Sequence, residues 1–466
     1  MIFDEDQENA TNCLSNHSII VAGAGCGKTT TLVKKIDKII KSGVSENEIL
    51  VISFTNEAVN NFIKKCPYSV KITTFHKEAL EYINDNYEIA DEYIIENIIK
   101  CFLENISQKL KKKIYYNFQN RFRLYSDESY ATLLSSESST SPIKVIKNIC
   151  RIIKTNNINV SKLKANIFNN FEKVLIYCST KVLDIYTKQL DENKLIDFDD
   201  IIIKATNYIN RNEIKAKYKH ILVDEYQDIS IIRENFLSSL VSKNKAILTV
   251  VGDDWQSIYR FSGSNISLFL NFEKRYHNSK RYLIRNTYRC PQKIVNISTK
   301  FILKNKMQIK KEIISNNFTK SIVKKIYSNN EKKSLYKIIS KIPNDKSVLI
   351  ISRNNYDIYN YTSKKIKYIN NKFIINGAMN KNIRFMTIHK SKGLEADIVI
   401  IINLTSGQDG FPSNKSLNIE EKLINCNEPI KYAEDRRLFY VAITRTKSDL
   451  YMIINKKNSS IFVNET

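Results

Sequence analysis

The chain has 466 residues, of which 42% are hydrophobic, and 73 basic against 48 acidic residues give it a formal net charge of +25. This length predicts at least two separately cored domains, and the charge favours a polyanionic partner such as nucleic acid, although a coding bias toward lysine would produce the same excess. Since there is no apolar run of about 18 residues and no apolar signal core, we expect a cytoplasmic protein with no membrane contact. The eight cysteines form no C-x-x-C pair, which argues against a zinc or iron–sulfur site and against a disulfide framework.

The first predicted unit is a strand, a glycine-rich turn and a helix, beginning at Ser18. Further apolar runs of strand length are typical of a parallel sheet buried on both faces; they lie at 49–54, 220–225 and 246–253. These runs predict one α/β domain formed by residues 1–76 and 196–279. Its interruption, residues 77–195, is mostly polar and helix-compatible, and we expect a helical insertion.

A second set of apolar runs predicts a second α/β domain over residues 280–466. The expected strands lie at 321–328, 347–352, 373–376, 396–404 and 449–455.

The turn after the first strand, "AGAGCGKTT", has the composition of a phosphate-binding loop. Glycines let backbone N–H groups approach phosphates at a helix N-terminus, Lys28 reaches the β/γ oxygens, and Thr29 is placed to hold Mg²⁺. A glycine turn with a chance Lys-Thr is the alternative, but the flanking strand and helix favour phosphate binding. We therefore expect ATP and Mg²⁺ here, at Ala22, Gly23, Ala24, Gly25, Cys26, Gly27, Lys28, Thr29 and Thr30.

Two adjacent acids end the strand-like run "HILVDE". Asp224 is placed to join Thr29 at the metal, and Glu225 is placed to take a proton from an attacking water. Adjacent acids at a strand end are often a solvated turn, an alternative that a phosphate loop in the same chain disfavours.

The stretch "GDDWQSIYRFSG" (252–263) again ends a strand at the edge where open α/β sheets bind ligands. Gln256 is predicted to sense the γ-phosphate or to position water. Tyr259, Arg260 and Phe261 suit stacking on nucleic-acid bases, although a packed loop is the alternative. The stretch is therefore predicted to couple the nucleotide state to a nucleic-acid strand.

In this order, the motifs resemble those of superfamily-one helicases of the UvrD/Rep family, and within it the helicase IV branch. The resemblance implies two RecA-like P-loop domains and assigns further nucleotide-site residues. Gln7 resembles the adenine-reading glutamine, and "NTYRC" (286–290) implies that Tyr288 stacks on adenine and Arg289 touches the γ-phosphate. Glu395 in "MTIHKSKGLEAD" would be linked to the nucleotide, and Arg445 in "EDRRLFYVAITRTK" would be the arginine finger.

The same resemblance implies contacts with single-stranded DNA. "SFTNEA" (53–58) would place Phe54, Thr55 and Asn56 on the strand, "TTFH" (73–76) would add Thr74 and His76, and motif V would add Thr387 and His389. Away from their motifs, both histidines would be read as structural imidazoles.

The chain also departs from the family pattern. In UvrD and Rep a large helical insertion splits the second domain, whereas here Arg289 and Met386 are only 97 residues apart (386 − 289). The resemblance thus implies a core motor that translocates 3′ to 5′ on single-stranded DNA and opens duplex junctions, with a nuclease or repair protein as a partner. The alternatives are a DNA-sensing ATPase subunit of an antiphage complex, a non-motor protein with a decayed P-loop, and RNA as the track.

Overall fold

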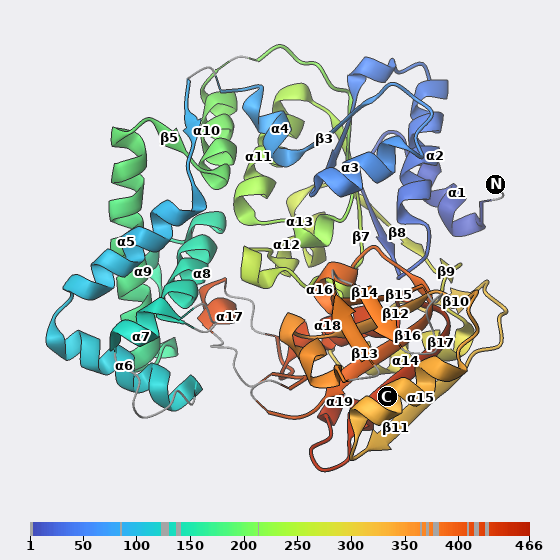
Figure 1. The fold of residues 1–466 in the computed structure, drawn as a ribbon. Helices are drawn as coiled ribbons and strands as arrows, with labels where there is room; N and C mark the ends of the chain where they lie inside the picture. The colour runs from blue at the N-terminus through green and yellow to red at the C-terminus, as the bar shows by residue number, and fades with distance from the viewer. Residues whose placement is uncertain are drawn as a thin grey trace.

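The computed structural model describes residues 3–83, 86–122, 130–136, 141–212, 214–363, 366–369, 372–375, 382–407, 410–413, 419–424 and 428–466. Two sheets stand side by side, the first all parallel and the second mostly parallel with an antiparallel edge; each lies between helices, and a helical lobe lies beside the first (Figure 1). The predicted α/β class with two domains is confirmed.

The first sheet has six strands in the order β3-β2-β6-β7-β1-β8, all parallel. Its strands are β1 (Ser18–Ala22), β2 (Ile49–Ser53), β3 (Lys71–Thr74), β6 (His220–Val223), β7 (Ile247–Gly252) and β8 (Lys280–Ile284). Its helices are α1 (Glu5–Asn12), α2 (Lys28–Lys41), α3 (Asn56–Ile63), α4 (Phe75–Leu80), α10 (Phe198–Arg211), α11 (Ile231–Asn244), α12 (Ile266–Leu270) and α13 (Phe272–Arg275). β1, β2 and β6 are buried along their whole length, as their continuous apolar sequences predicted.

The insertion is helical, as expected, and has its own core. Its helices are α5 (Glu92–Asn105), α6 (Gln108–Phe122), α7 (Tyr130–Ser135), α8 (Pro142–Thr155) and α9 (Asn170–Glu192). α8 begins with Ser141 capping the backbone N–H of Lys144 and a proline at the first turn, and α9 begins with a capping box between Asn169 and Glu172. At its neck, the two-residue strands β4 (Glu88–Ile89) and β5 (Leu195–Ile196) pair in parallel, so the chain enters and leaves the insertion side by side.

The second sheet has seven strands in the order β11-β17-β16-β12-β15-β14-β13. They are β11 (Val323–Ser328), β12 (Val348–Ser352), β13 (Ile366–Ile369), β14 (Lys372–Ile375), β15 (Ile383–Thr387), β16 (Ala396–Leu404) and β17 (Thr446–Asn455). The last residue of the run predicted at 373–376 lies outside the described residues. The remaining elements are the β9–β10 pair (Asn286–Thr287 and Ile314–Ser315), α14 (Gln292–Ile302), α15 (Glu331–Lys341), α16 (Ile388–Ser391), α17 (Ile419–Leu423), α18 (Ala433–Ile443) and α19 (Ile461–Asn464). Because these strands occupy much of the interval between Arg289 and Met386, the described part of it has no large helical insertion.

Two expected domain boundaries differ from the structure. The second domain was expected from residue 280, but β8 pairs with β1 along its whole length and forms the edge of the first sheet. The insertion was expected from residue 77, but Phe75 and Ala79 of α4 pack in the first domain's core, so the helical lobe begins at its β4 neck.

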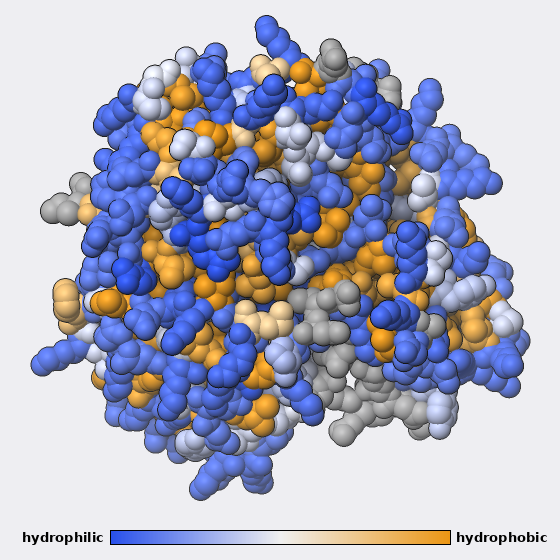
Figure 2. Space-filling model, turned by 180° about the vertical axis from the view of Figure 1, so that it is seen from behind, coloured by the Kyte–Doolittle hydropathy of each residue, from blue (hydrophilic) through white to orange (hydrophobic). Residues whose placement is uncertain are grey.

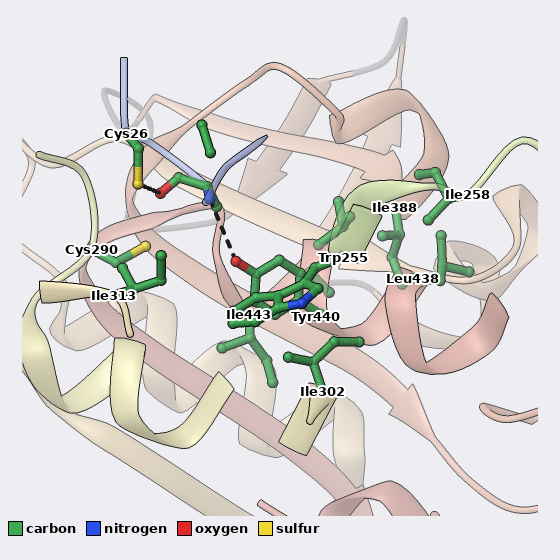
Figure 3. Close-up of a cluster of buried hydrophobic side chains, with 14 of the residues drawn as sticks. Cys26, Trp255, Ile258, Cys290, Ile302, Ile313, Ile388, Leu438, Tyr440 and Ile443 are labelled. Carbon is green, nitrogen blue, oxygen red and sulfur yellow. Dashed lines mark hydrogen bonds between the residues drawn. The ribbon is translucent and has the colours of Figure 1, made fainter. Parts of the chain in front are cut away.

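A shared apolar core joins the two sheets below the cleft (Figure 3). Cys26 comes from the turn after β1 and Trp255 follows β7, while Leu438 and Tyr440 come from α18. The rings of Trp255 and Tyr440 meet edge to face at 5.3 Å, and the backbone N–H of Ala24 contacts the Tyr440 hydroxyl at 3.5 Å. The phosphate loop therefore rests directly on side chains of the second domain.

α17 lies apart from the sheet that it follows in sequence and contacts α8 of the insertion (Figure 1). Ile419 and Leu423 are buried in the insertion's core, and Lys422 pairs with Glu172 at 2.6 Å. Seen from behind, the molecule is covered mainly by hydrophilic side chains with hydrophobic ones showing between them (Figure 2). Among the helices that the structure describes, none combines the length and the apolar composition that a bilayer crossing requires.

Candidate active site

The turn after β1 has the backbone that a phosphate loop needs. Gly25 and Gly27 have φ values of +74° and +76°, in the left-handed region where a side chain is strained. A Cβ on Gly25 would also lie 2.5 Å from the Cβ of Arg289. Because Lys28 begins α2, the free N–H groups of the helix face this turn.

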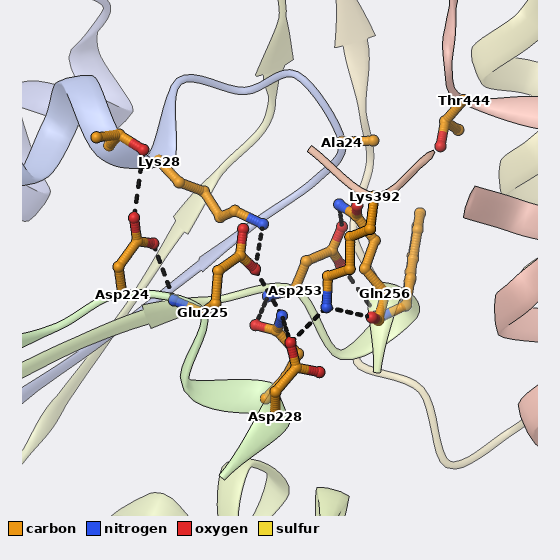
Figure 4. A network of polar contacts seen from close by, with 12 residues as sticks. Ala24, Lys28, Asp224, Glu225, Asp228, Asp253, Gln256, Lys392 and Thr444 are labelled. Atoms are coloured by element: carbon orange, nitrogen blue, oxygen red, sulfur yellow. Dashed lines mark hydrogen bonds and ion pairs between the residues drawn. The ribbon is translucent and has the colours of Figure 1, made fainter. Parts of the chain in front are cut away.

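Two pairs of side chains connect the turn to the end of β6 (Figure 4). Lys28 Nζ lies 3.1 Å from Glu225 Oε2, and the Thr29 hydroxyl donates to Asp224 Oδ2 at 3.3 Å. Burial and the neighbouring Glu225 charge raise the pKa of Asp224 to about 6. Burial also opposes ionisation of Glu225, but Lys28 and Lys392 outweigh it and lower its pKa to about 2. Glu225 is therefore ionised at neutral pH and able to accept a proton.

The Thr29 hydroxyl and the Asp224 carboxylate fit a magnesium ion. Both are hard oxygen donors, which Mg²⁺ prefers, and Mg²⁺ bound with nucleotides takes few protein ligands because phosphates and water supply the rest. Because burial and Glu225 disfavour the ionised form of Asp224, a cation bound next to its carboxylate would stabilise that form strongly. When bound, the ion would neutralise charge on the phosphates.

The backbone of Glu225 is itself unusual. Its φ is +54°, and a non-glycine residue in this region needs surrounding structure to hold it. The carboxylate accepts a hydrogen bond from Gln227 Nε2 at 2.6 Å, and the Glu225 N–H donates to Asp224 Oδ1 at 2.9 Å. These contacts point the carboxylate into the cleft.

Two arginines from beyond the first sheet face this acid. Arg445 donates from Nη2 to Gln256 Oε1 at 3.0 Å and from Nε to the carbonyl of Val441 at 3.0 Å. Arg289 pairs with Glu395 at 2.8 Å. Burial and then Arg289 lower the pKa of Arg445, so a negative charge in the cleft would stabilise both cations.

A cavity of about 370 Å³ unites these groups. The predicted residues that line it are Gly25, Cys26, Gly27, Lys28, Thr29, Thr30, Glu225, Gln256, Tyr288, Arg289, Glu395 and Arg445. Lys65, Gly393 and Lys447 also line it, and sequence reasoning missed them. Lys447 pairs with Glu395 at 2.8 Å, and its place two residues after Arg445 was an available signal.

The remaining predicted nucleotide-site residues lie behind or beside this cavity. Ala22 is buried in β1, and a Cβ on Gly23 would lie 2.8 Å from Ile313 Cδ1. The Ala24 carbonyl accepts from the Thr287 hydroxyl at 2.7 Å. These three residues shape the turn from behind.

Tyr288 lines the cavity, and Gln7 lies beside it against the phosphate loop. Gln7 is buried, belongs to the capping box of α1, and its Nε2 lies 3.5 Å from the carbonyl of Cys26. Tyr288 is 47% exposed and donates to Asp4 at 3.0 Å, so one face of its ring is free for a planar ligand.

A second cavity, about 670 Å³ in volume, lies on the other side of Glu225. It is a groove between the two sheets, and its lining includes Phe54, Thr55, Tyr259 and His389. The rings of Tyr259, Phe261 and His389 cluster there: Phe261 meets His389 edge to face at 5.3 Å and Tyr259 at 6.0 Å. Tyr259 and Phe261 belong to the first domain and His389 to the second, so domain movement would alter this cluster.

Other predicted groove residues shape helix ends. Thr55, Thr74 and Thr387 each cap a helix with their hydroxyl group, and Asn56 begins α3 on the exposed surface beside the groove. His76 lies beyond the groove in a neighbouring 330 Å³ cavity between the first domain and the insertion. Burial and then Arg233 lower its pKa to about 4, so it is neutral at physiological pH.

Arg260 differs from the expectation of a groove residue. Its side chain is only 6% exposed and pairs with Glu421, with Glu428 at 2.6 Å and with Glu434 at 3.7 Å. The three carboxylates come from the segment around α17 and α18, and they occupy the guanidinium fully enough to keep it from the strand side of the loop. The sequence could not indicate these ion pairs, because the three glutamates lie far from Arg260 in the chain and are separated from one another.

Sequence reasoning also missed Arg233 and Lys392, which line the groove, and Phe198, which lines the neighbouring 330 Å³ cavity with His76. Phe198 is 52% exposed and meets His76 edge to face at 5.5 Å, and Arg233 lies 5.9 Å from the centre of the Phe54 ring. Lys392 lies 4.9 Å from the Tyr259 ring centre, pairs with Asp228 and donates to the Gln256 carbonyl at 3.0 Å. Lys392 thus lines the groove and contacts the loop that carries Gln256. Its position directly before Gly393 in motif V is the sequence feature that could have identified it.

Comparison with known proteins agrees with this geometry. The model of the UvrD/REP helicase N-terminal domain matches residues 3–277, and that of the UvrD-like helicase C-terminal domain matches residues 364–457. DNA helicase IV of Escherichia coli is 29% identical over 96% of this chain and 67% of its own length. ATP-dependent DNA helicase Rep of Buchnera aphidicola (subspecies Baizongia pistaciae) is 27% identical over 86% of this chain and 58% of its own. ATP-dependent DNA helicase PcrA of Staphylococcus epidermidis is 28% identical, over 65% of this chain and 40% of its own. The chain thus spans between two fifths and two thirds of these relatives.

Proposed function

We propose, from the premise that this chain belongs to the UvrD/REP helicase family, that it is an ATP-dependent motor on single-stranded DNA. One observation carries the proposal: the loop after β7 supplies Gln256 to the nucleotide cavity and Tyr259 to the groove, only three residues apart. A movement of Gln256 when the γ-phosphate binds or leaves would therefore be transmitted through three residues of backbone to Tyr259, on which a base would stack.

In the proposed reaction, the nucleotide is held by the turn after β1 and Lys28 meets its terminal phosphates. Lys28 would exchange Glu225 for phosphate oxygens, which leaves the Glu225 carboxylate free to take a proton from water. Arg289 and Arg445 stabilise the charge that develops on the transferred group. Magnesium is proposed at Thr29 and Asp224.

Coupling to the strand is proposed to run through Lys392. This side chain holds Asp228 and the Gln256 carbonyl on one side and faces the Tyr259 ring on the other. When Arg445 and Gln256 engage a γ-phosphate, the second domain moves relative to the first, and the ring cluster that spans both domains changes its spacing. Alternate tightening and release would move the chain along the strand.

We propose 3′ to 5′ as the direction of movement, by analogy with the family. Strand displacement tests it: a duplex with a 3′ single-stranded tail is expected to be opened with ATP, and one with a 5′ tail is not. Faster opening of the duplex with the 5′ tail would contradict the proposed direction. If a duplex with a 3′ RNA tail is opened as fast as the one with a 3′ DNA tail, the track is not restricted to DNA.

A second candidate function follows from the compact second domain. The described residues between Arg289 and Met386 hold strands of the second sheet with α14 and α15, and among them there is no large helical insertion. The alternative is a DNA-sensing ATPase that acts through a separate nuclease, as in an antiphage complex. DNA-stimulated hydrolysis without displacement, together with a nuclease recovered on purification from the host, would favour it.

A further inference from the structure

A fully buried lysine stands behind the loop that carries Gln256. Lys311 lies between α14 and β10, and its Nζ contacts Asp253 Oδ1 at 2.6 Å and Asp254 Oδ1 at 2.7 Å. The same ammonium group lies 4.2 Å from the centre of the Trp255 ring. The side chains of Lys311, Asp253 and Asp254 are all 0% exposed.

The backbone next to Lys311 is tied to the same loop. The N–H of Ile309 donates to Asp254 Oδ2 at 2.7 Å, and the indole N–H of Trp255 donates to the carbonyl of Ile309 at 3.0 Å. Two residues beyond Lys311, Ile313 packs behind the phosphate loop at Gly23 (Figure 3). One short segment thus supports both the phosphate loop and the loop after β7.

This cluster costs free energy to bury. Removing an ammonium group and two carboxylates from water is unfavourable for each ion, and apolar residues of similar volume often stabilise a core equally well. Burial disfavours the charged form of Lys311, but Asp253 and Asp254 outweigh it and raise its pKa, so the lysine carries its charge. Stability alone is therefore a weak reason for this arrangement.

The second oxygen of Asp253 suggests another reason. Gln256 Nε2 donates to Asp253 Oδ2 at 2.6 Å (Figure 4). Because the amide nitrogen faces Asp253, the amide oxygen faces Arg445, which donates to it from Nη2 at 3.0 Å. A continuous chain of contacts runs from Lys311 through Asp253 and Gln256 to Arg445. An amide turned by 180° would set its NH₂ group against the guanidinium, which also only donates.

We propose that Lys311 is a positioning residue for hydrolysis: by holding the Asp253 carboxylate in place as a hydrogen-bond acceptor, it fixes the amide of Gln256 and, through it, the guanidinium of Arg445 at the γ-phosphate. Lys311 touches no nucleotide itself. Without it, the buried Asp253 carboxylate loses the partner that holds Oδ1 and can turn, and Gln256 loses its fixed orientation. The inference rests on the proposed ATP hydrolysis.

The test compares binding of ADP with binding of ADP–aluminium fluoride, which mimics the transferred phosphoryl group. ADP lies on the phosphate loop, whereas only the mimic needs Gln256 and Arg445. In Lys311→Met, affinity for the mimic is expected to fall at least about tenfold, as a displacement of about 1 Å can cost that much or more, with ADP affinity nearly unchanged. Equal weakening of both ligands, or of neither, would overturn the proposal.

Asp254→Asn is the matched control. Asp254 contacts Lys311 but makes no contact with Gln256, so this change is expected to leave the ratio of the two affinities unaltered. The double variant Lys311→Met/Asp254→Asn removes one unpaired carboxylate; it is expected to regain thermal stability while still losing affinity for the mimic. If Lys311→Met does not fold, the double variant carries the comparison.

The same proteins separate this inference from the proposed function. A wild-type protein that binds the mimic more tightly than ADP but hydrolyses no ATP with single-stranded DNA would contradict the motor. The ratio of affinities in Lys311→Met would still decide the role of Lys311.

Discussion

The nucleotide cavity and the groove lie on opposite sides of Glu225 and are built in different ways. In the cavity, ion pairs and hydrogen bonds of 2.6–3.3 Å fix Lys28, Thr29, Glu225 and Arg445. In the groove, ring contacts of 5.3–6.4 Å hold Tyr259, Phe261 and His389. The comparison teaches that the proposed catalytic site is preorganised, as charge stabilisation requires, while the proposed strand-binding site can change its spacing.

The largest expected effect tests the preorganised side. Arg445→Ala is expected to lower the rate of ATP hydrolysis by about 10³–10⁵-fold, because a guanidinium at the γ-phosphate is worth that much in related enzymes. Steady-state hydrolysis at saturating single-stranded DNA measures it. DNA affinity without nucleotide serves as the control and is expected to stay within about twofold, since Arg445 does not line the groove. A loss of DNA affinity as large as the loss of rate would abolish the distinction between the two regions.

Arg260 lies between the regions and sharpens their boundary. Arg260→Met is expected to destabilise the fold by up to about 3–5 kcal/mol, because it removes one of the two arginines that pair with the buried Glu428 and a partner of the partly exposed Glu421 and Glu434. Chemical denaturation measures the change. If the Arg260→Met protein is instead as stable as the wild type but binds DNA more weakly, Arg260 contacts the DNA strand, as the sequence predicted.

The ring cluster is expected to give an intermediate effect. Tyr259→Ala and Phe261→Ala should each weaken DNA binding by about 1–3 kcal/mol, the usual value of one stacked base. Fluorescence anisotropy with a labelled oligonucleotide measures the affinity, and ADP binding to the same proteins is the control. Equal losses of both ligands would identify the rings as core residues.

The connection between the regions should give the smallest effect. Lys392→Met is expected to reduce the stimulation of hydrolysis by single-stranded DNA by up to about tenfold, because it removes the contacts of Lys392 to Asp228 and to the Gln256 carbonyl, and one such contact is worth about 0.5–1.5 kcal/mol net. The ratio of rates with and without DNA is the measurement. Unchanged stimulation would mean that coupling runs through another path.

Sequence reasoning succeeded where chemistry is local. Lys28 and Glu225 lie in short motifs, and the structure brings these two side chains together at one cavity; buried strands such as β2 and β16 carry continuous apolar runs. It failed where partners are distant in sequence. β8 reads as polar because its first two residues are exposed at a sheet edge, which put the expected boundary at the wrong end of the strand. Arg260 and Lys311 depend on partners 161 to 174 and 57 to 58 residues away, respectively, which no local pattern records.

The measurement that tests the central claim most directly is steady-state ATP hydrolysis with and without a single-stranded DNA oligonucleotide, for the wild type beside Glu225→Gln. The glutamine keeps the size of the side chain but cannot take a proton. We predict strong stimulation of the wild type by DNA and a loss of about 10²–10⁴-fold in the variant, with ADP binding retained. Hydrolysis that is negligible in the wild type, or equal in the two proteins, would contradict the account.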